Sequence, residues 1–223
     1  MIHYFFKLFK KLRVVALLAC IGVAIAGSYE DFFRAIIQDD SSQVKELLAR
    51  GFDANTLDAT GQTGLHLALG ELSLKAGLLL IDWPKTDVNK LNAQGESALM
   101  LAALKGQTEL VQKLIAKKAD VNKTDWTPLH YAASAGRPEI ISLLIENHAY
   151  IDAESPNHTT PLMMAARYGS VASVRLLLEQ DADPRLKNQQ GLTALDFAKL
   201  GEKTDAADAI ASRMKKVQSS GKW

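Results

Sequence analysis

The stretch TPLHYAASAG, at residues 127–136, carries the signals of a short helix with defined ends. Thr127 can accept a hydrogen bond from the free N–H groups of a first helical turn, and Pro128 stands where its missing N–H costs nothing. Apolar residues follow at helical spacing, and the small pair Ala132 and Ala133 allows another helix to approach closely. Because a glycine then ends the pattern, the stretch predicts a short helix that packs against a neighbouring helix.

Weaker copies of this stretch occur along the chain. They are TGLHLALGEL from Thr63, SALMLAALKG from Ser97, TPLMMAARYG from Thr160 and TALDFAKLGE from Thr193. With Thr127 in its place after Ser97, the first residues of successive copies are 34, 30, 33 and 33 positions apart. A period of this length indicates a repeat protein, in which each unit buries its apolar helix faces against its neighbours.

The pattern resembles the ankyrin repeat, whose hallmark is T-P-L-H-x-A opening a helix-turn-helix unit that is followed by a hairpin-like finger. The resemblance covers about residues 28–216, and turn-forming residues recur where fingers are expected, as DVN at 87–89 and 120–122, NAQG at 92–95 and NQQG at 188–191. It implies an all-α solenoid of stacked helix-turn-helix units with short fingers. The residues that carry the repeat are Thr63, His66, Thr127, Pro128, His130, Thr160, Pro161 and Thr193.

We expect a repeat domain over residues 27–217, followed by a disordered tail at 218–223. It divides into about six units, at residues 28–60, 61–94, 95–125, 126–158, 159–191 and 192–217. The first unit lacks the Thr-Pro start and the last has no finger after it. Both therefore resemble the atypical capping units that shield the ends of such arrays from water.

Three departures from the pattern predict local irregularities. Trp83-Pro84 should break the second helix of the second unit, which we expect to be the least regular. Lys118 stands where a glycine usually follows the second helix, so its turn should be strained or differently formed. Before Trp126 the chain is three residues shorter than in neighbouring units, which predicts a short finger and a notch in the row.

Residues 1–26 have the composition of a secretory signal peptide: four basic residues precede an uncharged apolar run from Val14 to Ala26. Small residues at Ala24 and Ala26 suit cleavage before Gly27, which would deliver a bacterial protein to the periplasm. Two alternatives remain open. The segment could stay as an uncleaved anchor, or LLAC at 17–20 could be a lipobox whose Cys20 is acylated, and only in these ways would the protein meet a membrane.

Charge and cysteine content exclude several classes of function. The chain has 26 basic and 25 acidic residues, and loss of the four basic ones in the signal segment leaves 22 against 25. A mildly acidic chain lacks the positive field of a general nucleic-acid binder. Cys20 is the only cysteine, so the mature chain would contain no disulfide, zinc-cysteine cluster or thiol nucleophile.

His66 and His130 occupy equivalent positions of the repeat, where the resemblance implies a hydrogen bond to the backbone of the neighbouring finger. A metal site needs three or four suitably spaced ligands, and none can be assembled around them. The sequence also lacks a Gly-rich phosphate loop and the H-E-x-x-H and G-x-S-x-G motifs. We therefore predict no catalytic residue, no metal and no cofactor, and expect the protein not to be an enzyme.

The resemblance implies that partners contact the finger tips and the two positions after the paired alanines. The predicted partner-binding residues are Leu104, Lys105, Trp126, Ser134, Ala135, Pro156, Asn157, Thr159, Arg167 and Tyr168. Trp, Arg and Tyr are enriched among binding hot spots, which points to the centre of the array. The alternative for Trp126 is that it only packs against its own unit.

Three functions are compatible with the sequence. The chain could be a periplasmic adaptor or chaperone-like protein that binds a partner through its concave face. It could be an immunity protein that neutralises a toxin acting in the periplasm. It could also be an enzyme accessory, or a weak enzyme, with a ligand pocket that no motif reveals. The partner itself is not encoded in any recognisable motif.

Overall fold

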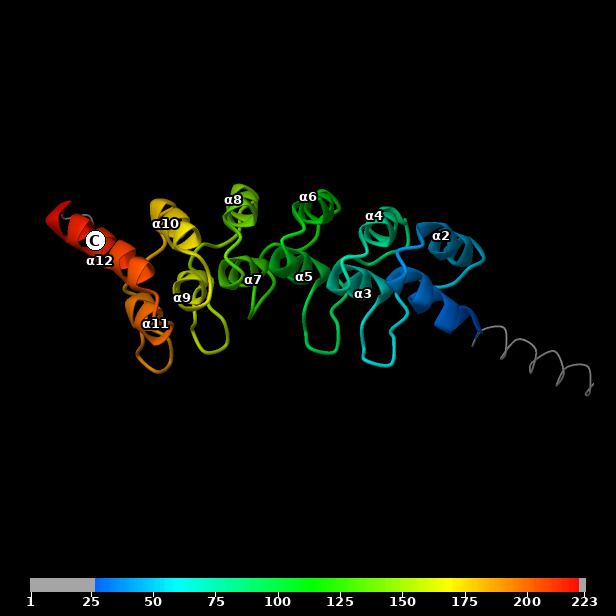
Figure 1. Cartoon of the computed structure of the whole chain (residues 1–223), viewed down its shortest axis with the longest axis horizontal. Helices are drawn as coiled ribbons and strands as arrows, with labels where there is room; N and C mark the ends of the chain where they lie inside the picture. Colours follow the sequence, from blue (N-terminus) through cyan, green and yellow to red (C-terminus); the bar gives the residue numbers. More distant parts are fainter. Residues whose placement is uncertain (1–26, 221–223) are drawn as a thin grey trace, which may run out of the picture.

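The computed structural model describes residues 27–220, which form a single row of helix pairs (Figure 1). A helix that ends at residue 37 pairs with α2 (Ser41–Ala49). The following pairs are α3 (Gly64–Gly70) with α4 (Leu74–Asp82), α5 (Ala98–Lys105) with α6 (Thr108–Ala116), α7 (Pro128–Ser134) with α8 (Pro138–Glu146), α9 (Pro161–Arg167) with α10 (Val171–Glu179), and α11 (Ala194–Leu200) with α12 (Thr204–Ser220). The predicted all-α solenoid is confirmed.

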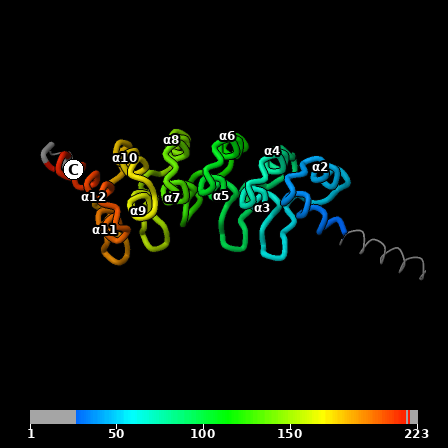
Figure 2. The backbone as a smooth tube through the Cα atoms, viewed as in Figure 1, coloured from blue at the N-terminus to red at the C-terminus, as the bar shows by residue number. Residues whose placement is uncertain are grey.

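The helices form two layers. The inner layer is α3, α5, α7, α9 and α11, each packed against the next, and the outer layer runs from α2 through the even-numbered helices to α12. Paired alanines such as Ala132 and Ala133 of α7 are fully buried, because only side chains this small let inner helices lie so close. The tube in Figure 2 shows the connecting fingers projecting from the inner layer.

Each inner helix begins in the same way. The side-chain oxygen of its N-cap residue accepts a hydrogen bond from the N–H three residues later, and these caps are Thr63, Ser97, Thr127, Thr160 and Thr193. Proline occupies the first position of α7 and α9. Local chemistry of a few residues thus sets the start of every inner helix.

One predicted irregularity is absent, and a second takes the form of backbone strain. Helix α4 has nine residues, as do α6, α8 and α10, so Trp83-Pro84 ends the helix at the usual length and the extra residue is absorbed in the turn that follows. Lys118 has φ 65°, close to the 67° of His148 and the 66° of Asp181. It therefore makes the same turn as its counterparts, in a left-handed conformation that strains any side chain with a β-carbon.

The ends of the chain fall partly outside this description. Residues 218–220, predicted to be disordered, form the last part of α12, because the helical pattern of its small and polar residues continues past 217. Ala24, Ala26 and Cys20 of the predicted signal segment lie outside the described residues, as do residues 221–223. Over residues 27–220, no helix has both the length and the apolar character that crossing a bilayer requires.

Four fingers share one construction, at residues 57–63, 91–97, 155–160 and 188–193. In each finger the backbone N–H of one polar residue donates a hydrogen bond to the carbonyl of the residue four positions later, which closes the tip into a loop. These polar residues are Asp58, Asn92, Ser155 and Asn188. Adjacent tips are linked as well, by Ala93 N to Gly61 O at 3.0 Å and by Gln189 N to Asn157 O at 3.0 Å.

The connection at residues 121–126, between α6 and α7, has no closed tip of this kind. It is visibly shorter than the fingers on either side (Figure 1). The row of fingers is therefore split into two linked pairs, with a gap in front of α7 where the sequence predicted a notch.

Candidate protein-binding site

A hollow of about 230 Å³, here called the α7 depression, lies on the exposed side of the central inner helix. It is lined by Leu104, Trp126, His130, Tyr131, Ser134 and Met164. Because α7 packs between α5 and α9, Leu104 of α5 and Met164 of α9 form its two side walls. His130 and Ser134 follow one turn apart on one face of α7, and Trp126, in the connection before the helix, completes the floor.

Two contacts hold the aromatic lining in place. The ring of Trp126 meets that of His130 edge to face, with the ring centres 5.2 Å apart. The Tyr131 hydroxyl donates a 2.8 Å hydrogen bond to Oε1 of Glu96, which belongs to the finger before α5. Burial and this neighbouring carboxylate raise the pKa of Tyr131, so it remains a neutral donor. The depression is consequently preformed, which lowers the entropic cost of binding.

The repeat histidines make the structural contacts that the resemblance implied. Nε2 of His130 donates to the Thr159 carbonyl at 2.8 Å, while its Nδ1 accepts from the Thr127 hydroxyl at 2.9 Å. Nε2 of His66 likewise donates to the Glu96 carbonyl at 3.1 Å. Burial disfavours the charged imidazole and lowers the pKa of His130 to about 4. Each histidine thus stays neutral and links one inner helix to the next finger by a hydrogen bond.

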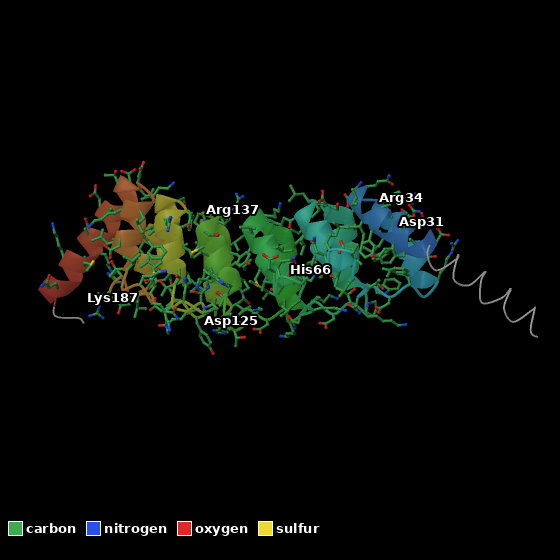
Figure 3. All side chains as sticks on the ribbon, turned by 90° about the horizontal axis from the view of Figure 1, so that it is seen from below. Asp31, Arg34, His66, Asp125, Arg137 and Lys187 are labelled. Carbon is green, nitrogen blue, oxygen red and sulfur yellow. The ribbon has the colours of Figure 1, made fainter. Side chains whose placement is uncertain are left out.

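Basic side chains stand at the C-terminal ends of the two inner helices that wall the depression. Lys105 stands in the last turn of α5 and Arg167 in the last turn of α9. The Arg167 guanidinium lies over the Tyr168 ring, with Cζ 5.1 Å from the ring centre, and Tyr168 is 55% exposed. Figure 3 shows Arg137, which follows the last turn of α7, on the edge of the array opposite to Asp125.

These cations have no carboxylate partner within the described part of the chain. Its salt bridges involve other basic residues, namely Arg34, Arg50, Lys113, Lys117, His158, Arg185 and Arg213. Lys105, Arg137 and Arg167 thus present unpaired positive charge beside an apolar hollow. A helix C-terminus favours cations by itself, so this placement is also compatible with the helix dipole.

The structure brings together most of the residues predicted to bind a partner. Leu104, Trp126 and Ser134 line the α7 depression, and Lys105, Ala135, Arg167 and Tyr168 cluster at the adjoining helix ends. Pro156 and Asn157 lie at the tip of the next finger. Trp126 packs on His130 of its own unit and also lines the hollow, so its role in binding stays a prediction.

Thr159 does not belong to this surface. Its side chain is only 2% exposed, and its carbonyl accepts the hydrogen bond from His130. Tyr131 and Met164, by contrast, were missed by sequence reasoning. Both follow directly after the histidine position of the repeat, where every copy carries a bulky residue, so the sequence held no signal that distinguished them.

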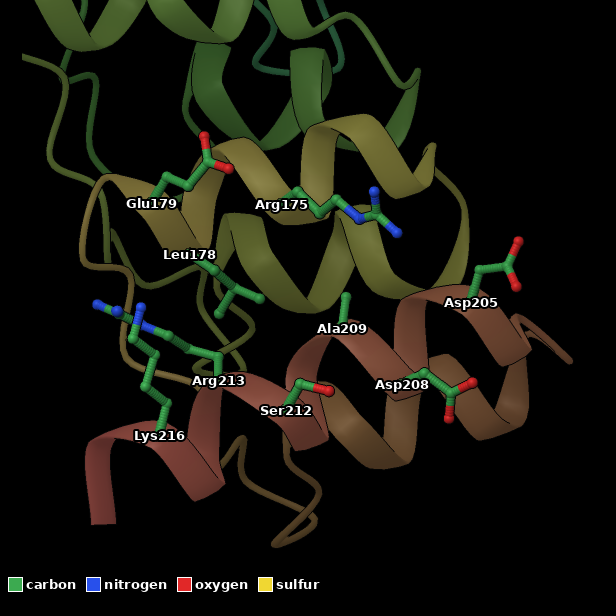
Figure 4. Close-up of a pocket in the computed structure, with 9 residues that line it drawn as sticks. All are labelled: Arg175, Leu178, Glu179, Asp205, Asp208, Ala209, Ser212, Arg213 and Lys216. Atoms are coloured by element: carbon green, nitrogen blue, oxygen red, sulfur yellow. The ribbon is translucent and has the colours of Figure 1, made fainter. Parts of the chain in front are cut away.

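A larger hollow of about 460 Å³ lies between α10 and α12 (Figure 4). Its charged residues do not converge: acidic Asp205 and basic Lys216 stand near opposite ends of α12, and Arg213 is held by Asp181 at 2.6 Å. Over residues 27–220 no group of three or more His, Cys, Asp or Glu side chains is placed to hold a metal ion. The α7 depression is therefore the better candidate for a binding site.

Models of the ankyrin-repeat family match this chain over most of its length. A model of three ankyrin repeats matches residues 32–125 and again 73–155, and a model of many repeats matches residues 149–198. The chain belongs to the ankyrin-repeat family. Ankyrin repeats are protein-interaction modules, and members of the family are typically binding proteins without enzymatic activity.

Ankyrin-repeat relatives include much longer proteins. The NF-kappa-B p105 subunit of Gallus gallus is 32% identical over 165 residues, which are 71% of this chain and 17% of that protein. The neurogenic locus notch homolog protein 1 of Homo sapiens is 35% identical over 123 residues, 53% of this chain and 5% of that one. The chain thus spans less than a fifth of the length of these relatives.

Two solved ankyrin-like structures match more completely. One is in the complex of Bd0816 predatory endopeptidase from Bdellovibrio bacteriovorus with immunity protein Bd3460, at 28% identity, covering 82% of this chain and 97% of that one, with a TM-score of 0.71. The other is an ankyrin repeat domain from Acinetobacter baumannii AYE, at 24% identity, covering 82% of this chain and 96% of that one, with a TM-score of 0.70. The second supports the fold alone.

Proposed function

We propose that this ankyrin-repeat protein is exported to the bacterial periplasm and binds a partner protein through the α7 depression and the C-terminal ends of α5, α7 and α9. The signal-like composition of residues 1–26 supports export. The α7 depression is the single observation that carries the proposed site. It combines a preformed hollow, half-buried Trp126 and exposed Tyr168 with cations that no carboxylate neutralises.

This combination suits protein recognition because hot spots are enriched in Trp, Tyr and Arg that surround a pocket on a rigid surface. Buried histidine and N-cap hydrogen bonds hold the helices of this surface to their neighbours, so the surface does not need to become ordered on binding. No group in the depression is arranged as a nucleophile with a general base, since His130 is committed to Thr127 and Thr159.

The test is a capture experiment from periplasmic extract with three forms of the mature protein. The site variant carries Trp126→Ala, Arg167→Ala and Tyr168→Ala. The control variant carries Tyr150→Ala and Arg50→Ala, which remove an exposed aromatic and an exposed cation away from the inner helix ends. Urea unfolding must first show that all three forms are equally folded.

We expect one protein to be captured by the parent and the control but lost from the site variant. Loss from both variants would place the binding surface elsewhere, as would retention by both. Mass spectrometry identifies the captured protein, and size-exclusion chromatography of the purified pair gives the stoichiometry.

A second candidate function, favoured by the likeness to the endopeptidase–immunity complex, is that of an immunity protein. In this case the partner is a peptidase exported by the same cell, and binding blocks its activity. The test expresses each such peptidase in the periplasm with the parent or the site variant. Growth rescued by the parent alone supports the immunity role, whereas capture of a partner whose activity is unchanged supports an adaptor.

A further inference from the structure

We infer that the partner segment is an acidic loop carrying one bulky apolar side chain, which seats in the α7 depression with its carboxylates beside Lys105 and Arg167. This inference rests on the proposed function and specifies the chemistry of the partner. It follows from three features of the depression: its lining, the charges on its rim, and the gap through which it opens.

The lining selects an apolar side chain. Leu104, Trp126 and Met164 contribute apolar surface from three successive repeat units, and the Tyr131 ring is fixed by its bond to Glu96. A hollow of about 230 Å³ is of the size of a single large side chain. The Met164 thioether is flexible and polarisable, so it can adapt to either an aliphatic or an aromatic occupant.

The rim selects negative charge. Lys105 directly follows Leu104 on one wall, and Arg167 stands one turn after Met164 on the other. Arg137 adds a third cation, because its guanidinium lies against Gly106, the C-cap of α5. Among the described residues none of these three cations has a carboxylate partner, and an arginine whose guanidinium lies over a tyrosine ring keeps its N–H groups available for a carboxylate.

The gap in the finger row admits a loop. In the linked finger pairs, the N–H of the second tip residue, Ala93 or Gln189, donates to the preceding finger. The corresponding residue of the finger after the gap is Pro156, which has no N–H to donate. That finger therefore makes no such backbone bond to the short connection at 121–126, so the row of fingers is left open in front of α7.

The probe for this inference is a phage-displayed library of disulfide-closed random peptides, selected on the mature parent protein. Enriched peptides are then synthesised, and their Kd values are measured by calorimetry at two salt concentrations. Four variants are compared with the parent: Trp126→Ala, Lys105→Glu, Arg167→Glu and Lys199→Glu. Lys199→Glu is the matched control, because Lys199 occupies the last turn of α11 as Lys105 does in α5 but does not border the depression.

We expect a consensus of one large apolar residue flanked by Asp or Glu. Lys105→Glu and Arg167→Glu should each weaken binding about tenfold, Lys199→Glu less than about twofold, and higher salt should weaken binding by the parent. Consensus peptides that lack acidic residues, or equal effects of Lys105→Glu and Lys199→Glu, would overturn the inference. If those peptides still require Trp126, the proposed site itself stands.

Peptides that bind the Trp126→Ala variant as tightly as the parent would instead refute the proposed site. Failure to enrich any peptide would also count against the inference, since a preformed hollow with charged walls should select such loops from the library.

Discussion

The Tyr131 hydroxyl of α7 donates a 2.8 Å hydrogen bond to the carboxylate of Glu96, 35 residues earlier in the chain. This bond ties the central inner helix to the finger before α5. Glu96 is held in turn, because its second carboxylate oxygen accepts from the Asn92 side chain at 2.8 Å. The lining of the α7 depression is thus fixed by a contact between units.

Replacement of Tyr131 by Phe should lower the free energy of unfolding by about 1–2 kcal/mol, because a half-buried bond to a charged acceptor is lost. The ring would remain, so peptide or partner binding should change little. Urea unfolding of Tyr131→Phe, Glu96→Gln and the double variant measures the coupling. Additive effects in this double-mutant cycle would show that the two side chains do not interact in solution.

Acid should destabilise the fold through His130. Its folded pKa of about 4 lies below the ordinary value of 6.5, so the unfolded chain binds more protons between these two values. Stability is therefore complete above about pH 6.5 and is lost as pH falls towards 4, by an amount on the order of 3 kcal/mol. Urea unfolding at a series of pH values measures this slope.

The matched variant is His130→Met, because Met100 and Met163 occupy the same position in other units. It should be less pH-dependent over this window, with a residual slope from His66, whose pKa burial also lowers. An unchanged slope in the variant would contradict the assignment to His130.

Leu72 is exposed and left-handed at the same time, with φ 62° and 58% of its surface accessible. Leu72→Gly should stabilise the protein by about 0.5–1 kcal/mol, because glycine has no β-carbon to strain. Leu72→Ala keeps the β-carbon and serves as the control, so it should give no such gain. A thermal-unfolding comparison in which both variants behave alike would argue against strain at this turn.

Gly136 should tolerate no side chain. It has φ 64°, and a β-carbon there would come within 2.9 Å of the Ser170 backbone nitrogen. Gly136→Ala should therefore destabilise by about 2–4 kcal/mol, from strain and overlap together. Gly191→Ala meets the same backbone strain, at φ 75°, with nothing within 4 Å, and should cost only about 1 kcal/mol. Urea unfolding of the two variants separates the effect of strain from that of overlap. Equal losses in the free energy of unfolding would show that overlap with Ser170 contributes nothing.

Filling the gap in front of α7 should block binding without unfolding the protein. Insertion of three residues after Lys123 restores the usual finger length, and a surface insertion of this size changes stability by less than about 1 kcal/mol. Binding of the selected peptides should weaken at least about tenfold. The control insertion, after Gln190, lengthens a finger away from the depression and should leave the Kd of the peptides unchanged. If the Lys123 insertion variant still bound the peptides fully, the gap would not be the route of entry.

Sequence reasoning was most successful where a few neighbouring residues decide the outcome. N-cap threonines, first-turn prolines and paired alanines act within one or two turns of a helix, and their recurrence every 30 to 34 residues predicts the stacking of units as well. The same reasoning failed at Trp83-Pro84. There α4 ends at Asp82, directly before the pair, after the same nine residues as α6, α8 and α10, so the break falls where the helix would end in any case.

The sequence alone therefore determined the class of fold, the family and the position of the short connection, since each depends on local spacing that repeats. Only the tertiary structure decided which side chains share the α7 depression, that Thr159 is buried, and that Tyr131 reaches Glu96. These outcomes depend on how three units stack and on which side chains meet across their interfaces. Such contacts join residues about 30 positions apart, and no local pattern along the chain encodes their geometry.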